Sequence, residues 1–245
     1  MAQIDFLILD GSGDAAAMRR GVTAGPTKPN GGGNFVYGFH SQQAAAQAIG
    51  NYYNRANFNP LITDAAAATG GSVEIAMRKH LGASATGYTP FVFICLRSGT
   101  GGAPAPSVDD VGYLLGLDNN NPYVIGLYKG LPSAGLISAA SSPSSLLRAG
   151  SATFSPGQWH HLRLDAIVNP TGDVVLRCFQ NDLTANTVSA PVWAAIPGIT
   201  DFIDDALGVE SGSPPLSGGF AGWGMWSAGD GRVCYYDHFR LARQP

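Results

Sequence analysis

Two adjacent histidines, His160 and His161, stand between a tryptophan and an aspartate in the segment PGQWHHLRLDA, residues 156–166. Imidazoles bind transition metals and transfer protons near neutral pH, so this pair is the first candidate for chemistry. The residues that follow alternate between apolar and polar, as in a β-strand. Because successive strand side chains point to opposite faces, the two histidines cannot ligate one metal ion together. We therefore interpret the pair as the start of a strand, with His160 on the face of Leu162 and Leu164.

The other histidines give no local metal motif. His40, His80 and His238 have no partner two or four residues away, and the chain has no C-x-x-C pair, so a metal trio would have to be assembled by the tertiary fold. Acidic and amide oxygens at residues 109–110 and 118–121 are candidates for Ca²⁺, but neither stretch follows an EF-hand pattern. We expect no metal and no cofactor, and we leave Ca²⁺ open as an alternative.

Three possible functional motifs are not supported by the residues around them. A glycine-rich stretch at residues 11–16 resembles a dinucleotide loop, but it contains Asp14 and no helix follows it. Residues 82–86 (GASAT) lack the second glycine of a nucleophile elbow. Glu74 and Glu210, the two glutamates of the chain, are far apart in sequence. We therefore expect no catalytic residue and no enzyme activity.

Exposed aromatic side chains are a common route to sugar binding, because pyranose rings stack on them. The candidates for glycan contact are Trp193, Trp223, Trp226 and Tyr236, with Tyr52 and Tyr53 as further aromatic residues. Core packing is the alternative for each of them. Trp223 and Trp226 are three residues apart and would face opposite sides of an ideal strand, so we expect at least one of them to point away from the core.

The composition is that of a sheet protein with many turns. Of 245 residues, 45% are apolar and only 13% are charged, while 33 glycines and 16 prolines supply turn formers. The net charge of −3 offers no basic surface for phosphates, so we expect neither nucleic acid nor a membrane as a partner.

The cysteines and the first residues bear on the compartment. Cys95, Cys178 and Cys234 are odd in number and lie in apolar runs, which favours buried thiols formed in a reducing compartment. Residues 1–13 have no positive stretch and an apolar run of only four residues, so we expect no signal peptide.

Several strand patterns separated by turn residues, without alternating helices, predict an all-β antiparallel sandwich or barrel. We expect residues 1–33 to form a strand and an extended arm or loop, and residues 34–245 to form the sandwich domain. Within that domain the patterns predict a half-buried strand at 72–80, a central strand at 90–98, hairpins at 111–130, 159–183 and 219–244, and short helices within 43–54 and after 199.

The hairpin FSPGQWHHLRLDAIVNPTGDVVLRCFQNDL and the ending GGFAGWGMWSAGDGRVCYYDHFRLARQ resemble the concanavalin A-like, laminin G-like jelly rolls. The resemblance extends from Asn34 to Gln244 and implies a jelly-roll β-sandwich. Glucanases of this group carry an E-x-D-x-x-E strand, and Glu74 is followed by IAMRK instead, so the resemblance does not extend to that activity.

Similar jelly rolls occur as accessory virion proteins of tailed bacteriophages. The resemblance therefore implies a non-enzymatic virion structural protein, a capsid decoration or tail accessory, made in the host cytoplasm and found in the virion. Its expected partners are other virion proteins, copies of itself and a host surface glycan. The alternatives are a free carbohydrate-binding lectin and a polysaccharide-degrading enzyme.

Overall fold

The computed structural model contains only β-strands as regular elements in the part of the chain that it describes. That part comprises residues 2–3, 18–20, 29–32, 37–40, 50–56, 70–79, 88–97, 111–117, 124–130, 146–205, 215–216, 220–227 and 233–243. The strands are β1 (Ala2–Gln3), β2 (Met18–Arg20), β3 (Tyr37–His40), β4 (Gly50–Ala56), β5 (Gly71–Lys79), β6 (Tyr88–Arg97), β7 (Val111–Leu117), β8 (Val124–Gly130), β9 (Leu146–Thr153), β10 (His160–Val168), β11 (Val174–Asn181), β12 (Trp193–Ala195), β13 (Phe202–Asp204), β14 (Phe220–Ser227) and β15 (Val233–Arg243). Among these residues there is no helix long and apolar enough to cross a membrane.

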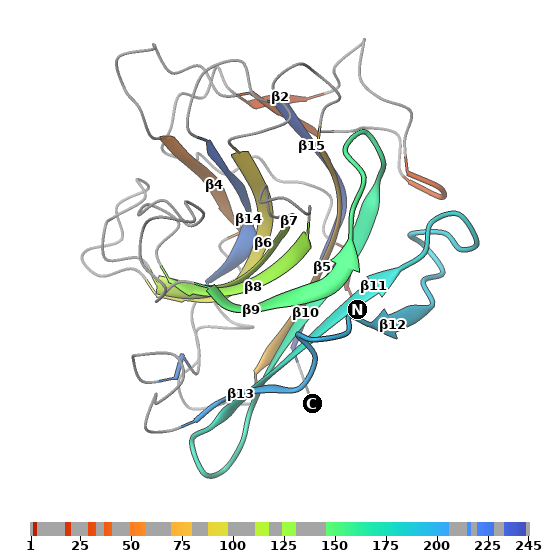
Figure 1. The fold of residues 1–245 in the computed structure, drawn as a ribbon. Helices are drawn as coiled ribbons and strands as arrows, with labels where there is room; N and C mark the ends of the chain where they lie inside the picture. The colour runs from red at the N-terminus through yellow and green to blue at the C-terminus, as the bar shows by residue number, and fades with distance from the viewer. Residues whose placement is uncertain are drawn as a thin grey trace.

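The strands form two antiparallel sheets that pack face to face (Figure 1). The nine-stranded sheet has the order β12-β11-β10-β5-β15-β3-β2, with β1 paired to β15 and β13 paired to β11. The six-stranded sheet has the order β4-β14-β6-β7-β8-β9 and curves in Figure 1. This confirms the predicted all-β antiparallel sandwich.

The core lies between the two sheets, and every second residue along a strand contributes its side chain to it. On β5 it takes Val73, Ile75 and Met77, and on β10 it takes Leu162 and Leu164. The six-stranded sheet contributes Val92, Ile94, Tyr113, Leu115, Leu117, Ile125 and Leu127. Each such aliphatic side chain contributes roughly 1.5–3 kcal/mol when it is removed from water, so this layer is the main source of stability.

The faces turned away from this core are also buried on the central strands. Phe91 and Phe93 alternate with core residues of β6 and are at most 1% exposed. On β5, Glu74 alternates with core residues and is 1% exposed. The prediction of a half-buried strand at 72–80 was therefore wrong in one respect: the alternation is correct, but both faces are covered.

Two of the three predicted hairpins are confirmed. Strands β7 and β8 pair from Gly112–Gly130 to Leu117–Ile125. Strands β10 and β11 pair along their lengths, and the turn between them is closed by the amide of Asn169, which donates to the carbonyl of Asp173 at 2.8 Å. Gly172 in this turn has a φ of 91°, a conformation that favours glycine.

The third predicted hairpin, at 219–244, was wrong. Strand β14 pairs with β4 and β6 in the six-stranded sheet, whereas β15 pairs with β5, β3 and β1 in the nine-stranded sheet. Two apolar runs joined by a turn look the same in sequence whether the chain folds back on itself or crosses to the opposite sheet. Here the two strands belong to different sheets.

The two short helices were also predicted wrongly where the structure describes them. Gly50–Ala56 is strand β4, since its tyrosines favour a sheet and β14 supplies a neighbour. Phe202–Asp204 is strand β13, which pairs with β11. Residues 43–49 lie outside the described part of the chain.

The described pieces of residues 1–33 are built into the sandwich. Strand β1 pairs with β15, and β2 pairs with β3. Farther along, the amide of Val188 donates to the carbonyl of Asn30 at 2.8 Å. Strands of the sandwich and a neighbouring loop therefore provide partners for the backbone of these pieces. The rest of the predicted arm lies outside the described residues.

Two of the three cysteines are free thiols in the core, as predicted. Cys178 and Cys234 are both 0% exposed, and burial raises the pKa of each thiol far above its ordinary value. A neutral, enclosed thiol is unreactive and packs as a small apolar group. The side chain of Cys95 lies outside the described part.

Candidate functional site: a buried histidine–glutamate cluster

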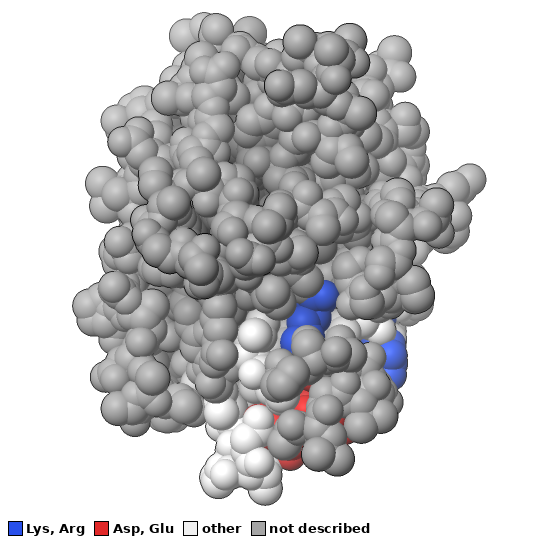
Figure 2. Space-filling model, turned by 90° about the vertical axis from the view of Figure 1, so that its left-hand side faces the viewer, with Lys and Arg blue, Asp and Glu red and all other residues white. Residues whose placement is uncertain are grey.

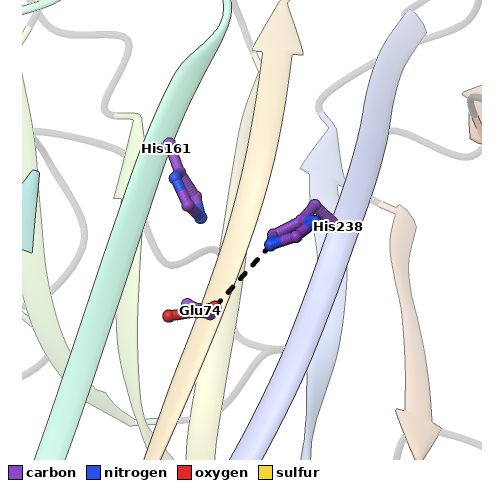
Figure 3. Close-up of side chains that lie close together, drawn as sticks. All are labelled: Glu74, His161 and His238. Carbon is purple, nitrogen blue, oxygen red and sulfur yellow. Dashed lines mark ion pairs between the residues drawn. The ribbon is translucent and has the colours of Figure 1, made fainter. Parts of the chain in front are cut away.

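Three titratable side chains meet on the face of the nine-stranded sheet that is turned away from the core. Glu74 comes from β5, His161 from β10 and His238 from β15, and Figure 3 shows them pointing toward one another. The three strands are neighbours in the sheet, with β5 in the middle. Residues more than 150 positions apart in the chain are thus brought together by strand pairing.

A β-bulge in β15 places His238 in this cluster. The register of β15 against β5 shifts between Asp237 and Arg240, so one extra residue is inserted there. His238 has a φ of 56°, a left-handed conformation that is uncommon outside glycine. Its amide donates to the Asp237 carboxylate at 2.7 Å, which holds the irregular backbone in place. Without the bulge, strict alternation would turn this side chain to the other face.

The cluster is tight and enclosed. One potential ligand atom from each of the three residues lies within 4.8 Å of the others, and His238 Nε2 is 3.8 Å from Glu74 Oε1. The side chains of His238 and Glu74 are 3% and 1% exposed, and His161 is fully buried. In the part of the chain that the structure describes, Glu74 Oε1, His161 Nε2 and His238 Nε2 have no hydrogen-bond partner. Such orphaned polar atoms are rare in folded proteins.

The other nitrogen of His161 faces the amide of Asn181, 3.1 Å from its Nδ2. That amide is oriented by two backbone groups: Nδ2 donates to the carbonyl of Thr187, and Oδ1 accepts from the amide of Val192, both at 3.0 Å. Nδ1 of His161 is therefore an acceptor, and the neutral ring carries its proton on Nε2. Trp193 packs against the same imidazole, with ring centroids 4.6 Å apart.

His238 has the opposite arrangement. Its ring hydrogen-bonds to the backbone of Val188, and because Nε2 has no partner, Nδ1 is the nitrogen that donates to this carbonyl. The lone pair of Nε2 then points into the cluster. Val188 is itself tied to Asn30, so the segments around these two residues cover the site from outside.

Charges around the cluster are paired. Arg240 Nη1 lies 3.3 Å from Glu74 Oε1, and Arg163 binds Asp165 through two hydrogen bonds of 2.7 and 2.8 Å. Burial raises the pKa of Glu74, and the two arginines oppose that rise. Burial lowers the pKa of His161 to about 3 and that of His238 to about 4, with Arg240 adding to both effects. Both imidazoles are therefore neutral at pH 7.

A second polar cluster lies between the sheets. Lys129 Nζ is 2.6 Å from Asp204 Oδ2, and the Tyr113 hydroxyl donates to the same oxygen at 2.5 Å and accepts from the amide of Leu216 at 2.8 Å. The side chains of Lys129 and Asp204 are at most 1% exposed. Burial lowers the pKa of Lys129, although Asp204 works against the change. This cluster ties β8 and β7 to β13.

The predicted split of the histidine pair is confirmed. His160 lies on the core side, 3.2 Å from the carbonyl of Ser155 and against the ring of Phe154, while His161 faces the other way. The sequence analysis nevertheless missed the cluster with Glu74 and His238. The available signal was the outward position of Glu74 and His161 on their strands, but the pairing of those strands and the bulge at His238 left no sequence pattern.

Two of the four aromatic residues expected to contact a glycan are in the core, which corrects that prediction. Trp223 is 3% exposed and packs against Phe239 with ring centroids 5.0 Å apart, and Tyr236 is fully buried. Both lie on core-facing positions of their strands, where no glycan can reach them. Trp193 is partly exposed beside His161. The side chains of Trp226, Tyr52 and Tyr53, and both stretches considered for Ca²⁺, lie outside the described part.

Two exposed residues of opposite charge are paired on the surface of the described part. Arg177 Nε lies 2.8 Å from Asp201 Oδ1, with side chains 48% and 63% exposed. Figure 2 shows basic and acidic atoms close together on the small described part of one face.

Neither a protein-family model nor a curated protein sequence matches the chain. Solved structures are similar in fold: the marine PL-14 alginate lyase from Aplysia kurodai has a TM-score of 0.47 at 10% identity, over 86% of this chain and 83% of that one. The potassium-bound Emp46p carbohydrate recognition domain has a TM-score of 0.46 at 12% identity, over 97% and 94%. The legume lectin-like domain from Entamoeba histolytica has 0.41 at 10%, over 94% and 91%. These scores are all below 0.5, so the likeness carries no conclusion about family or activity. The strand pairing of the chain itself shows a β-sandwich of two antiparallel sheets.

Proposed function

We propose that this chain is a non-enzymatic structural protein of a bacteriophage virion, acting as a capsid decoration or a tail accessory. The observation that carries the non-enzymatic part is the enclosure of the two titratable clusters in the described part of the chain. Glu74, His161 and His238 are at most 5% exposed, and so are Lys129 and Asp204. A polymeric substrate needs an open groove with an acid and a base within hydrogen-bond reach. In these clusters the acid and base groups are closed off from a substrate.

The buried free thiols support assembly in a reducing cytoplasm before release in a particle. The proposed partners are other virion proteins and copies of this chain, with no nucleic acid and no membrane. Strand β12 is a sheet edge of only three residues with exposed alanines, and next to it Val192 is 64% exposed. An apolar edge of this kind suits contact with a neighbouring subunit.

The test is detection of the chain in purified particles. Particles are collected from a lysate of the source, washed in high salt and separated on a density gradient, and the chain is quantified by mass spectrometry against the major capsid protein. The proposal expects co-migration at a fixed copy ratio. A chain that stays at the top of the gradient contradicts the virion role. An isolated chain that depolymerises a polysaccharide contradicts the non-enzymatic role.

A second candidate function, glycan binding, is favoured by Trp193. One side of its indole packs on His161 and the residue remains partly exposed, so a pyranose ring has a platform of fixed orientation. If the chain is a lectin or a glycan-binding virion protein, Trp193→Ala should lower its affinity for an arrayed glycan at least about tenfold, in keeping with the loss of one stacked ring. Trp159→Ala is the matched control, because Trp159 is also partly exposed and lies directly before β10. Equal affinity of wild type and Trp193→Ala would contradict glycan binding at this position.

A further inference from the structure

We propose that Glu74, His161 and His238 bind one divalent transition-metal ion of the zinc class, which links β5, β10 and β15 across the outer face of the nine-stranded sheet. Two imidazoles and one carboxylate form a donor set that Zn²⁺ takes in proteins. Three protein ligands leave a fourth position for a water molecule. Since the site is enclosed, the role of the ion is structural.

The separations suit such an ion. Ligand atoms about 2.0–2.2 Å from a tetrahedral metal lie roughly 3.3–3.6 Å apart. His238 Nε2 and Glu74 Oε1 are 3.8 Å apart, and the complete set lies within 4.8 Å. Small side-chain rotations therefore bring all three atoms to bonding distance. In Figure 3 the side chains already converge on one point between the strands.

The two imidazole nitrogens that face the cluster have no hydrogen-bond partner. His161 Nε2 and His238 Nε2 are buried and make no hydrogen bond to any described residue. Glu74 Oε1 has ion pairs with Arg240 at 3.3 Å and with His238 at 3.8 Å. Each of the two histidine rings is held through its other nitrogen, by Asn181 and by Val188. Ligating histidines commonly donate their other N–H to a second group, which fixes the ring orientation. His238 is held in this way by the carbonyl of Val188, whereas His161 accepts from Asn181 and has to change its tautomer.

The backbone at His238 is a second, independent observation. A non-glycine residue with a φ of 56° is uncommon, and here the bulge aims this side chain at Glu74. Conformations of this kind persist where the surrounding structure holds them, and they concentrate at ligand-binding sites. The amide bond of His238 to Asp237 supplies that hold.

Metal binding changes the proton position on His161. Nε2 must lose its proton to bind the ion, and a proton on Nδ1 would then face the NH₂ group of Asn181. The Asn181 amide must therefore turn to present its oxygen, and the turn breaks its bonds to the carbonyl of Thr187 and the amide of Val192. An Asn181→Asp variant presents a carboxylate oxygen and loses only the bond to Thr187, so it should bind the ion more tightly.

The test uses the full chain with any histidine tag removed and with metals stripped by a chelator. Co²⁺ is added first, because a site with histidine and carboxylate ligands gives visible absorption bands that free Co²⁺ lacks. Zn²⁺ affinity then follows from displacement of Co²⁺ and from competition with a chromophoric chelator, and thermal unfolding is measured with and without Zn²⁺. We expect one ion per chain, a Co²⁺ spectrum that Zn²⁺ abolishes, and a higher melting temperature with Zn²⁺.

Single-residue variants test whether the ion binds at these three residues. Glu74→Gln, His161→Gln and His238→Asn should each weaken Zn²⁺ binding at least about 100-fold. This loss is larger than the 10- to 100-fold loss of affinity that is typical when a residue hydrogen-bonded to a ligand is replaced. Asparagine is chosen at 238 because it tolerates a positive φ. His160→Gln is the matched control, since His160 is the adjacent buried histidine on the core side. Asn181→Asp should strengthen binding.

Several outcomes would overturn the proposal. They are a wild-type chain with neither Co²⁺ bands nor a Zn²⁺-dependent melting temperature, a His160→Gln variant that loses as much affinity as His161→Gln, and ligand variants that keep wild-type affinity. If a ligand variant fails to fold, the test uses the Co²⁺ spectra and the Zn²⁺ affinities of the folded wild type and Asn181→Asp proteins. An Asn181→Asp protein that binds Zn²⁺ no more tightly than the wild type then contradicts the proposal.

Discussion

The two histidines at the start of β10 show how one peptide bond separates two environments. His160 contacts the core residue Phe154, whereas His161 meets His238, Trp193 and Asn181 on the opposite face. Both rings are buried, and burial lowers the pKa of each below its ordinary value. Strand geometry thus gives two identical, adjacent residues different contacts. The two histidines lie in separate environments, one on each face of the sheet.

At the residue scale, the metal-free protein should lose stability as the pH falls. The folded-state pKa of His161 is about 3 and that of His238 about 4, against about 6.5 in an unfolded chain. Below pH 6.5 the unfolded chain therefore binds more protons, and the free energy of unfolding decreases down to about pH 4 by a few kcal/mol. The raised pKa of Glu74 has the opposite effect on stability. At pH values just above the ordinary pKa of a glutamate, the folded chain binds more protons than the unfolded chain, so the free energy of unfolding increases as the pH falls.

The measurement is urea unfolding between pH 7 and pH 4 with a chelator present. His161→Gln should give a shallower dependence on pH than the wild type, because one of the two histidine contributions is removed. Arg177→Gln, in an exposed ion pair, is the control and should keep the wild-type slope. Parallel curves for wild type and His161→Gln would contradict this account.

At the scale of elements, a buried ion pair connects the two sheets. Lys129 lies on β8 of the six-stranded sheet, and Asp204 on β13, which pairs with β11 of the nine-stranded sheet. The bond from Tyr113 on β7 adds a third strand to the connection. Burying two charges is costly, so this pair contributes less to net stability than to fixing how the sheets sit on each other.

Lys129→Met should therefore cost about 3–5 kcal/mol in the free energy of unfolding, because the buried Asp204 carboxylate loses its contact with the Lys129 ammonium. The double variant Lys129→Met/Asp204→Asn should be more stable than Lys129→Met alone, since asparagine is neutral and can still accept from Tyr113. Chemical denaturation of the three proteins measures both differences. A double variant that is less stable than the single one would show that charge burial does not set the cost.

At the scale of the whole molecule, the N-terminal segment completes the sandwich. Strands β1 and β2 pair with β15 and β3, and the backbone of Asn30 meets Val188, which covers His238. Deletion of residues 1–33 should therefore lower the melting temperature and raise hydrogen exchange at His238 and its neighbours. Deleting residues 1–3 alone is the milder control. Unchanged stability and exchange after the full deletion would mean that this segment acts only as a separate arm.

Much of the sandwich follows from local patterns. Alternation along residues 71–79 and 160–168 determines which side chains face the core, and turn residues such as Gly172 determine where the β10–β11 hairpin closes. These features are predictable because side-chain direction in a strand has a period of two and turns need particular residues. The same patterns sort His160 from His161.

Strand pairing and the bulge were decided only by the tertiary structure. Nothing local distinguishes β15 as a neighbour of β5 from a hairpin partner of β14, because both arrangements bury the same apolar face. No sequence pattern around His238 indicates the extra residue of the bulge, which turns its side chain toward Glu74. The sequence by itself therefore determined the sheet class and the face on which each regular strand residue lies. The cluster of Glu74, His161 and His238 exists because long-range hydrogen bonding set three distant strands side by side.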